Sequence, residues 1–152
     1  MSTPNTNDFT VKFANVNGTG SSSANGMFMK SIFRMGIPVV GKNYFPSNIQ
    51  GLPTWYEVRV NENGYLAPSG SVDIMVAMNA QTYDEDLSAV EPGGYLIYDS
   101  SWPRETLMTR DDITVLGVPL AKMCNEAFDT ARARTLMKNT TYVGVLAALL
   151  EM

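Results

Sequence analysis

Residues 17–23 read Asn-Gly-Thr-Gly-Ser-Ser-Ser, a composition suited to binding an anion. They follow a β-rich run at 10–16 and precede apolar residues with helical spacing. Gly18 permits a tight turn, and Gly20 permits another group to approach the backbone closely. Free N–H groups at a helix start, together with the helix dipole, favour a phosphate. The candidate binding residues are Asn17, Gly18, Thr19, Gly20, Ser21, Ser22 and Ser23.

This segment departs from two phosphate-binding patterns. Ser23 stands where the third glycine of a G-x-G-x-x-G motif would be, and no acidic residue follows the second predicted strand to bind a ribose. The segment also lacks the Gly-Lys-Ser/Thr end of a P-loop. Lys42 occupies the position after the second strand, and its charge suits a phosphate. A phosphate cradle and a plain tight turn both remain open, with Lys42 as a further candidate.

Composition excludes several kinds of chemistry. The 152 residues include no histidine and one cysteine, Cys124. A Ser-His-Asp or Cys-His nucleophile, a histidine-ligated metal and a cysteine-held iron–sulfur cluster are therefore excluded within this chain. The formal charge of -4 argues against nucleic acid, and no apolar run is long enough to span a membrane. A single cysteine permits no internal disulfide, so we expect a cytoplasmic location.

The elements that must position the glycine segment alternate between strand and helix. The strands are predicted at 10–16, 37–42, 55–60, 72–78, 95–100 and 112–118. The helices are predicted at 21–35, 81–90, 120–138 and 141–152. This order predicts one α/β domain at 10–152, after a tail at 1–9, with a three-layer, Rossmann-like arrangement and a mainly parallel sheet. Residues 43–67 are expected to add an antiparallel hairpin or edge strand, with a turn at Asn63-Gly64 and a short strand at 65–67.

Helix ends and other polar positions have simpler structural explanations. Ser21 or Ser22 is the expected N-cap of the first helix, and Gly36 is the glycine expected just after its end. The apolar run at 37–42 is expected to be buried. Asp99 is better explained as a cap for the next segment than as a ligand, and Cys124 as a buried apolar residue. The acidic runs at 84–86 and 111–112 are expected on a solvated surface.

Four segments occur in an order and spacing typical of a known family. They begin with NGTGSSSANG and continue to EVRV (17–60), followed by DIMVAMNAQTY (73–83), EPGGYLIYDSSW (91–102) and GVPLAKMCNEA (117–127). They resemble the gamma domain of 2-oxoacid:ferredoxin oxidoreductases. The form most similar has this domain fused to the N-terminus of the alpha subunit, as in 2-oxoglutarate oxidoreductases. The resemblance covers about residues 10–152.

The resemblance implies a part of an enzyme that oxidatively decarboxylates a 2-oxoacid, with 2-oxoglutarate favoured. Coenzyme A (CoA) is the co-substrate, and the products are acyl-CoA, CO₂ and reduced ferredoxin. Thiamine diphosphate, Mg and an iron–sulfur cluster are implied for the intact complex and none for this domain alone. The implied partners are the alpha domain, the beta subunit, ferredoxin and CoA. The glycine segment, from Asn17 through Ser23, is implied in CoA binding, and Lys42 as a phosphate partner follows from its charge and position.

Family members of the fused form are longer, so the chain is expected to be truncated from an alpha/gamma fusion and inactive by itself. The loop at 43–54, with Asn48, Gln50 and Gly51, is either a contact for the catalytic subunits or a loop ordered by its own prolines. Two other functions stay open. One is a stand-alone module that binds a nucleotide or acyl-CoA, and the other is a structural assembly domain whose glycine segment binds nothing.

Overall fold

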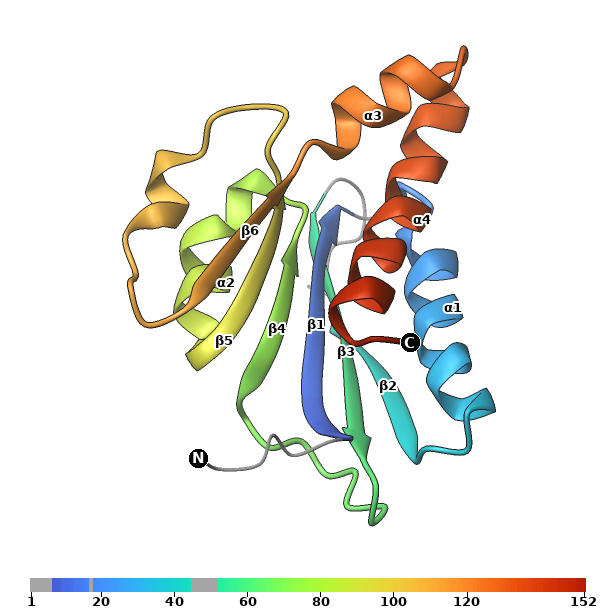
Figure 1. The fold of residues 1–152 in the computed structure, drawn as a ribbon, viewed down its shortest axis with the longest axis vertical. Helices are drawn as coiled ribbons and strands as arrows, with labels where there is room; N and C mark the ends of the chain where they lie inside the picture. The colour runs from blue at the N-terminus through green and yellow to red at the C-terminus, as the bar shows by residue number, and fades with distance from the viewer. Residues whose placement is uncertain (1–6, 17, 45–51) are drawn as a thin grey trace.

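A mixed six-stranded sheet with the order β2-β3-β1-β4-β5-β6 forms the middle layer (Figure 1). The structure is a computed structural model and describes residues 7–16, 18–44 and 52–152. The strands are β1 (Asp8–Val16), β2 (Val39–Tyr44), β3 (Pro53–Asn61), β4 (Val72–Ala77), β5 (Val90–Asp99) and β6 (Thr114–Val118). The helices are α1 (Ser21–Arg34), α2 (Tyr83–Ala89), α3 (Leu120–Ala127) and α4 (Ala131–Leu149), with short 3₁₀ turns η1 (Ala80–Thr82) and η2 (Glu105–Met108).

The strand directions confirm the predicted sheet. β1, β4, β5 and β6 are parallel to one another. β3 is antiparallel to β1 on one side and to β2 on the other. The strand predicted at 55–60 is confirmed as part of β3, in which Val58 and Val60 are fully buried while Glu57 and Arg59, at the intervening positions, are half-buried. The chain is therefore an α/β domain with an antiparallel strand inserted into a mainly parallel sheet.

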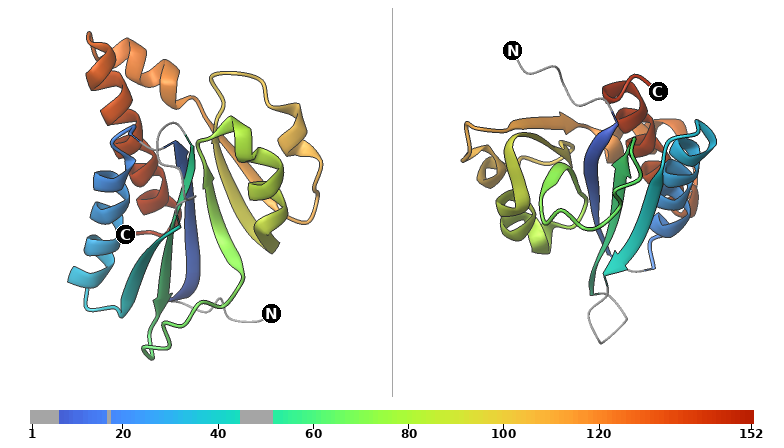
Figure 2. Two further views of the ribbon diagram at one scale, coloured as in Figure 1. Left: turned by 180° about the vertical axis from the view of Figure 1, so that it is seen from behind. Right: turned by 90° about the horizontal axis from the view of Figure 1, so that it is seen from below.

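Helices cover both faces of the sheet, which confirms the three layers (Figure 2). On one face, α1 and α4 enclose a core that includes Phe13, Phe28 and Tyr142. On the other face, α2 packs over a second core that includes Ala14 and Met75. Phe13 and Ala14 are consecutive in β1, so they point to opposite faces. The Phe13 and Phe28 rings meet edge to face at 5.6 Å, and full burial of each contributes about 1.5–3 kcal/mol.

β2 corrects one prediction about the sheet. It forms an edge of the sheet, and its residue Val40 is 41% exposed, so the apolar run at 37–42 is not a buried strand. The reason is that β3 takes the place beside β1. The predicted strand at 65–67 is also wrong, since the described residues from 62 to 71 include no strand. Gly64 does form a turn, with φ +78°, but the chain then continues as a loop into β4.

The C-terminal helices break at a different place from the predicted one. α3 ends at Ala127 and α4 begins at Ala131, whereas the sequence predicts a break near Asn139. Phe128 is extended, and the Thr130 hydroxyl caps α4 by accepting from the Ala133 N–H at 3.2 Å. Asn139 therefore lies in the middle of α4, where it is 5% exposed.

Asp99 ends β5 and anchors the start of α3. Its carboxylate is buried and accepts from the N–H of Ala121 at 3.2 Å and from the N–H of Ser101 at 3.1 Å. Lys138 of α4 forms an ion pair with it at 3.3 Å. The prediction that Asp99 caps the following segment is confirmed. Gly36, with φ +80°, likewise follows the end of α1 as predicted, and Cys124 is buried at 2% exposure.

Asp86 contradicts the prediction of a solvated acidic run. Asp84 and Glu85 are exposed, but the Asp86 carboxylate is fully buried. It accepts hydrogen bonds from Trp55 Nε1 at 3.0 Å and from Thr82 Oγ1 at 2.7 Å. Burial raises the pKa of Asp86 above its ordinary value, and the two donors only partly offset this effect. Asp86 thus links α2 to β3 instead of facing water.

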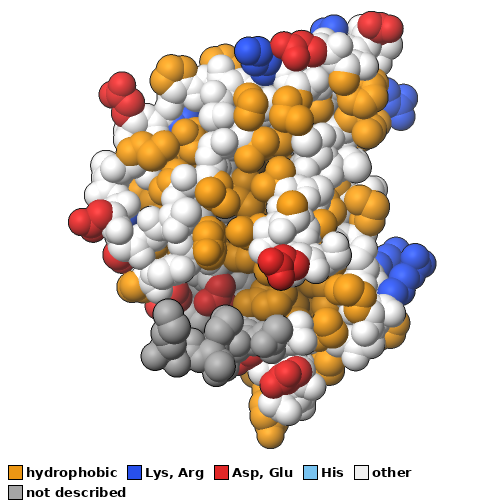
Figure 3. All heavy atoms as spheres, in the orientation of Figure 1, with side chains coloured by type: hydrophobic (Ala, Val, Ile, Leu, Met, Phe, Trp, Pro, Cys, Tyr) orange, Lys and Arg blue, Asp and Glu red, His pale blue; other side chains and the backbone are white. Residues whose placement is uncertain are grey.

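Part of the surface is strongly apolar. On the face shown in Figure 3, hydrophobic side chains gather in the middle while most charged ones lie toward the outline. On α1 and just after it, Met27, Phe33 and Met35 are 43%, 68% and 50% exposed. Large exposed side chains of this kind are typical of protein contact surfaces. None of the helices that the structure describes is both long enough and apolar enough to cross a membrane.

Candidate functional site: the glycine loop and its cavity

The glycine loop (residues 18–20) leaves the carboxyl end of β1 and leads directly into α1. Gly18 and Gly20 have φ values of +88° and +77°, in the left-handed region that favours glycine. Gly20 is the N-cap, so the predictions of Ser21 or Ser22 at this position are wrong by one or two residues. Within the described residues no side chain caps α1, and its first turn contains no acidic residue. The first N–H groups of this 14-residue helix thus have no side-chain acceptor, which suits an anion.

Gly20 is also closely approached by a side chain of α4. A Cβ at this position would lie 2.6 Å from Leu136 Cδ2 of α4, which is shorter than any ordinary contact. At Gly18 no described atom lies within 4 Å of such a Cβ, so only its backbone conformation favours glycine. Glycine is therefore favoured at Gly18 by backbone conformation alone, and at Gly20 by backbone conformation together with the approach of α4.

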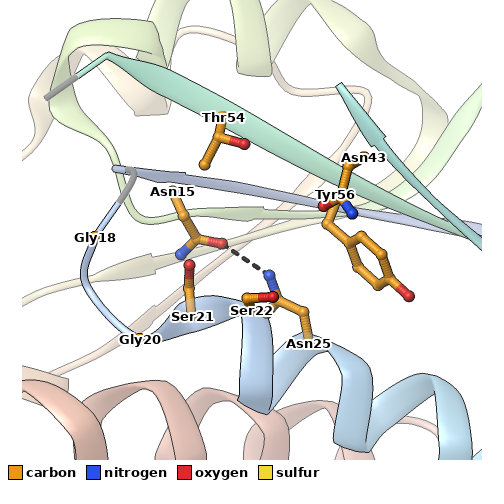
Figure 4. A pocket seen from close by; sticks show the side chains of 9 residues that line it. All are labelled: Asn15, Gly18, Gly20, Ser21, Ser22, Asn25, Asn43, Thr54 and Tyr56. Carbon is orange, nitrogen blue, oxygen red and sulfur yellow. Dashed lines mark hydrogen bonds between the residues drawn. The ribbon is translucent and has the colours of Figure 1, made fainter. Parts of the chain in front are cut away.

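A cavity of about 240 Å³ lies between the glycine loop, the start of α1 and strands β1, β2 and β3 (Figure 4). Its lining is polar but uncharged in the described part of the chain. The lining residues are Asn15, Gly18, Gly20, Ser21, Ser22, Asn25, Asn43, Thr54 and Tyr56. Amides, hydroxyls and backbone N–H groups can donate hydrogen bonds to the oxygens of a phosphate without a lysine or arginine.

A buried chain of hydrogen bonds runs from α4 to this cavity. Tyr142 of α4 is fully buried, and its hydroxyl donates to Asn25 Oδ1 in α1 at 2.5 Å. Asn25 Nδ2 donates in turn to Asn15 Oδ1 of β1 at 3.1 Å, the bond drawn in Figure 4. Asn15 and Asn25 are each 3% exposed. Burial raises the pKa of Tyr142 far above the ordinary value for a phenol, so the hydroxyl keeps its proton.

A second contact from α4 fixes the loop backbone. Asn139 Nδ2 donates to the carbonyl oxygen of Thr19 at 2.8 Å. The Thr19 hydroxyl donates to the carbonyl oxygen of Val16 at 2.9 Å, so this hydroxyl stabilises the conformation of the loop. Because a trans peptide points its C=O and N–H in opposite directions, the N–H of Gly20 points away from Asn139. α4 therefore sets the orientation of the peptide group before α1.

The structure brings together only part of the predicted site. Gly18, Gly20, Ser21 and Ser22 line the cavity, whereas Thr19 and Ser23 do not. Ser23 is exposed at the start of α1. Asn17 lies outside the described residues, as do Asn48, Gln50 and Gly51 of the long loop.

Lys42 is separated from the cavity by the sheet. In β2 it pairs with Glu57, while its neighbour Asn43 pairs with Tyr56 and lines the cavity. Because consecutive strand residues point to opposite faces, Lys42 projects from the other face, where its Nζ lies 5.0 Å from the centre of the Tyr44 ring. Its position in the sequence therefore does not bring Lys42 to the glycine loop.

A second cavity, of about 450 Å³, lies between the glycine loop and the start of α4. Gly18, Thr19 and Gly20 border it from one side, and Ala131, Arg132, Thr135 and Leu136 border it from α4. Arg132 is the charged residue in this described lining. The loop thus has an uncharged cavity on one side and an arginine on the other.

Metal and cluster chemistry does not fit the side chains of this chain. The sequence has one cysteine and no histidine. In the ranges that the structure describes, no group of three or more His, Cys, Asp or Glu side chains could hold a metal ion. No step that requires the implied iron–sulfur cluster or Mg is therefore assigned to these residues.

Sequence reasoning missed the residues that hold the loop from behind. Asn139 and Tyr142 are three positions apart and share the buried face of α4. Because the sequence predicted a helix break at residues 139–140, the two residues were not expected on one helix face. Asn15 and Asn25 interrupt apolar positions in β1 and α1, which is a usable signal for buried polar groups. Asn43, Thr54 and Tyr56 had no such signal, because the pairing of β2 with β3 places them beside the loop.

Comparisons with known proteins agree with this fold and with the resemblance seen in the sequence. The family model described as pyruvate ferredoxin/flavodoxin oxidoreductase matches residues 10–152. The chain is 31% identical over 124 residues to the alpha subunit of 2-oxoacid:ferredoxin oxidoreductase 2 from Aeropyrum pernix. This alignment covers 81% of the chain and 19% of the relative, so the chain spans about a fifth of that subunit.

Solved structures share the fold. The 2-oxoglutarate:ferredoxin oxidoreductase from Magnetococcus marinus, with 2-oxoglutarate, coenzyme A and succinyl-CoA bound, has a TM-score of 0.79 at 22% identity, covering 94% of this chain and 24% of the other. The gamma subunit of a keto/oxoacid ferredoxin oxidoreductase from Geobacter sulfurreducens has a TM-score of 0.70 at 16% identity, covering 93% of this chain and 76% of the other. Because the family model covers almost the whole sequence, the chain belongs to the pyruvate ferredoxin/flavodoxin oxidoreductase family of oxidoreductases.

Proposed function

We propose that the glycine-loop cavity binds a phosphate-bearing part of CoA. The start of α1 supplies N–H groups without a side-chain cap, and the cavity beside them is lined by amides and hydroxyls. The structure of the Magnetococcus marinus relative contains coenzyme A, which makes CoA a suitable candidate ligand. The hydrogen-bond donors that line the cavity support CoA as the ligand more strongly than the glycine motif does by itself.

In this proposal the chain works as the gamma-type domain of a 2-oxoacid:ferredoxin oxidoreductase, with 2-oxoglutarate as the favoured 2-oxoacid. The intact cytoplasmic complex would form acyl-CoA and CO₂ and pass electrons to ferredoxin. Thiamine diphosphate, Mg and the iron–sulfur cluster would lie in the alpha domain and beta subunit. The exposed Met27, Phe33 and Met35 suit packing against such partners.

The observation that carries the proposal is the uncapped start of α1 at Gly20. In a plain tight turn, a serine, threonine or aspartate side chain commonly takes the first N–H groups of a helix. Here Gly20 leaves these groups without a side-chain acceptor in the described residues, next to a cavity. A phosphate would serve as the missing acceptor.

Ser22→Glu tests this proposal without harming the helix. A carboxylate in the first turn stabilises a helix, but at Ser22, which lines the cavity, it would occupy the place of the phosphate. We expect CoA to shift the amide resonances of residues 18–22 in an NMR titration of the 152-residue chain, and Ser22→Glu to weaken binding at least about tenfold.

Ser23→Glu is the matched control, because Ser23 is exposed in the same turn and does not line the cavity. It should retain CoA binding within about threefold. Absence of CoA-dependent shifts in the loop, or equal losses in both variants, contradicts the proposal and favours a structural assembly domain.

A further inference from the structure

The buried hydrogen-bond chain has a fixed direction that determines what the cavity presents to a ligand. We propose that Asn15 contacts the ligand through its Nδ2 group and donates a hydrogen bond to a phosphate oxygen, and that Tyr142 and Asn25 are positioning residues that hold Asn15 in this orientation. This inference rests on the proposed function of the cavity, but it concerns residues of β1, α1 and α4 outside the glycine loop.

The direction follows from the proton of Tyr142. A phenol can donate one hydrogen bond, and the partner of this buried hydroxyl is Asn25 Oδ1, at 2.5 Å. In the structure the hydroxyl is the donor of this bond and Asn25 Oδ1 is the acceptor. Tyr142 therefore donates, and the carbonyl end of the Asn25 amide must face it.

The orientation of Asn25 then fixes that of Asn15. Since Asn25 Oδ1 faces Tyr142, the Nδ2 group of Asn25 faces Asn15 and requires an acceptor there. Asn15 supplies Oδ1 at 3.1 Å. The remaining end of the Asn15 amide, Nδ2, points away from Asn25 toward the glycine loop (Figure 4). The hydroxyl of Tyr142 thus orients the two amides so that Asn15 presents its N–H donor, and not its carbonyl oxygen, to the cavity.

Asn15 belongs both to the buried hydrogen-bond chain and to the lining of the cavity. Asn15 is 3% exposed, its Oδ1 accepts from Asn25 Nδ2, and its Nδ2 end is the part of the amide that faces the glycine loop (Figure 4). Because the described lining contains no lysine or arginine, an added amide donor beside the uncapped N–H groups of α1 contributes directly to binding an oxyanion.

Asn15→Asp tests the contact with a change of charge and almost none of shape. Inorganic pyrophosphate and CoA are the probes, and binding is followed by calorimetry and by amide shifts of the 152-residue chain. At neutral pH we expect affinity to fall at least about tenfold, because a carboxylate faces the phosphate. Affinity should recover as the pH falls and the new carboxyl takes up a proton, whereas the wild-type affinity should not rise in this way. Pantetheine, which has no phosphate, should show no such penalty.

Tyr142→Phe tests the positioning residues. It removes the donor while keeping the ring, so the Asn25 amide is free to turn over and Asn15 with it. We expect pyrophosphate affinity to fall by about threefold to tenfold. Side-chain amide resonances of Asn15 and Asn25 should also shift in the ligand-free variant, which a general loss of stability would not produce. Tyr95→Phe is the control, because Tyr95 packs against the same core without belonging to the hydrogen-bond chain.

Failure of this inference can be told from failure of the proposed function. If wild-type chain binds pyrophosphate and CoA but Asn15→Asp binds equally well at neutral pH, the Asn15 contact is wrong and the loop site stands. If the side-chain amide resonances of ligand-free Tyr142→Phe match those of the wild type, the positioning role is wrong. If the wild type binds neither probe, the proposed function fails together with the Asn15 contact.

Discussion

Asn139 of α4 donates a hydrogen bond to the main-chain carbonyl of Thr19, a residue 120 positions earlier, at 2.8 Å. This bond joins the last helix to the loop between the first strand and the first helix. It turns the Thr19 peptide toward α4, and it explains why a polar residue occupies the buried face of a helix. The glycine loop is therefore shaped by tertiary contacts as well as by its own glycines.

Asn139→Ala should destabilise the fold and loosen the glycine loop. The carbonyl of Thr19 would lose its partner in a site where Asn139 is 5% exposed. We expect a loss of about 1–3 kcal/mol in the free energy of unfolding, measured by urea denaturation. Thr140→Ala is the adjacent control, since Thr140 is exposed on the same helix, and it should change stability by less than about 0.5 kcal/mol. Equal losses in the two variants would show that the Asn139 bond has no particular role.

Gly20→Ala should cost more stability than Gly18→Ala. Both positions have positive φ, which costs an alanine about 1–2 kcal/mol. Only at Gly20 would the new Cβ also clash, 2.6 Å from Leu136 Cδ2. The added Leu136→Ala substitution should therefore restore part of the stability of Gly20→Ala and none of that of Gly18→Ala. Urea denaturation of the single and double variants measures this coupling.

Asp86→Asn should change the pH dependence of stability. Burial raises the pKa of the Asp86 carboxyl, so the folded chain holds this proton more tightly than the unfolded chain does. The stability that this group contributes is present below its unfolded pKa and is lost as the pH rises through its higher folded pKa. Asparagine carries no charge and keeps an acceptor for Trp55 Nε1.

The stability gained by Asp86→Asn should therefore be greater at pH 7 than at pH 4, as measured by urea denaturation at both values. Asp84→Asn, at an exposed position of the same run, should show no comparable difference. A constant difference between Asp86→Asn and wild type over this range would mean that the Asp86 carboxyl titrates alike in the folded and unfolded chains.

Lys42→Ala should leave CoA binding unchanged within about twofold. Lys42 projects from the face of β2 opposite to Asn43 and the cavity, so its charge is separated from the loop by the sheet. Calorimetry or the loop amide shifts used for Ser22→Glu provide the measurement. A loss as large as that of Ser22→Glu would instead support the phosphate partnership predicted from the sequence.

The fold could be predicted well where local pattern and tertiary structure agree. Apolar alternation placed β1 and β3, helical spacing placed α1, and a continuous apolar run placed β4. β2 could not be recognised as an edge strand, because exposure depends on β3 taking the position beside β1. A pattern of apolar residues shows that a strand can be buried, but it does not show which neighbouring strands will cover it.

The candidate site was predictable only in the part that is local in sequence. Gly18 and Gly20 gave a turn and a helix start, and both are found. Lys42 was assigned by its position after a strand, but a shift of one residue reverses the face from which a side chain projects. Asp86 was assigned to the solvated run with Asp84, and its burial depends on Trp55, 31 residues away.

The three contacts of α4 with the loop region, through Leu136, Asn139 and Tyr142, impose thermodynamic reciprocity. The contacts of α4 hold the loop in the shape that a ligand binds, and this contributes to the free energy of ligand binding. By linkage, the bound ligand stabilises the packing of α4 against the loop by the same amount. The C-terminal helix and a ligand at the first loop therefore stabilise each other. Local unfolding of α4 therefore reports on site occupancy, even at its last turn, because Leu149 lies only about two helical turns beyond Tyr142.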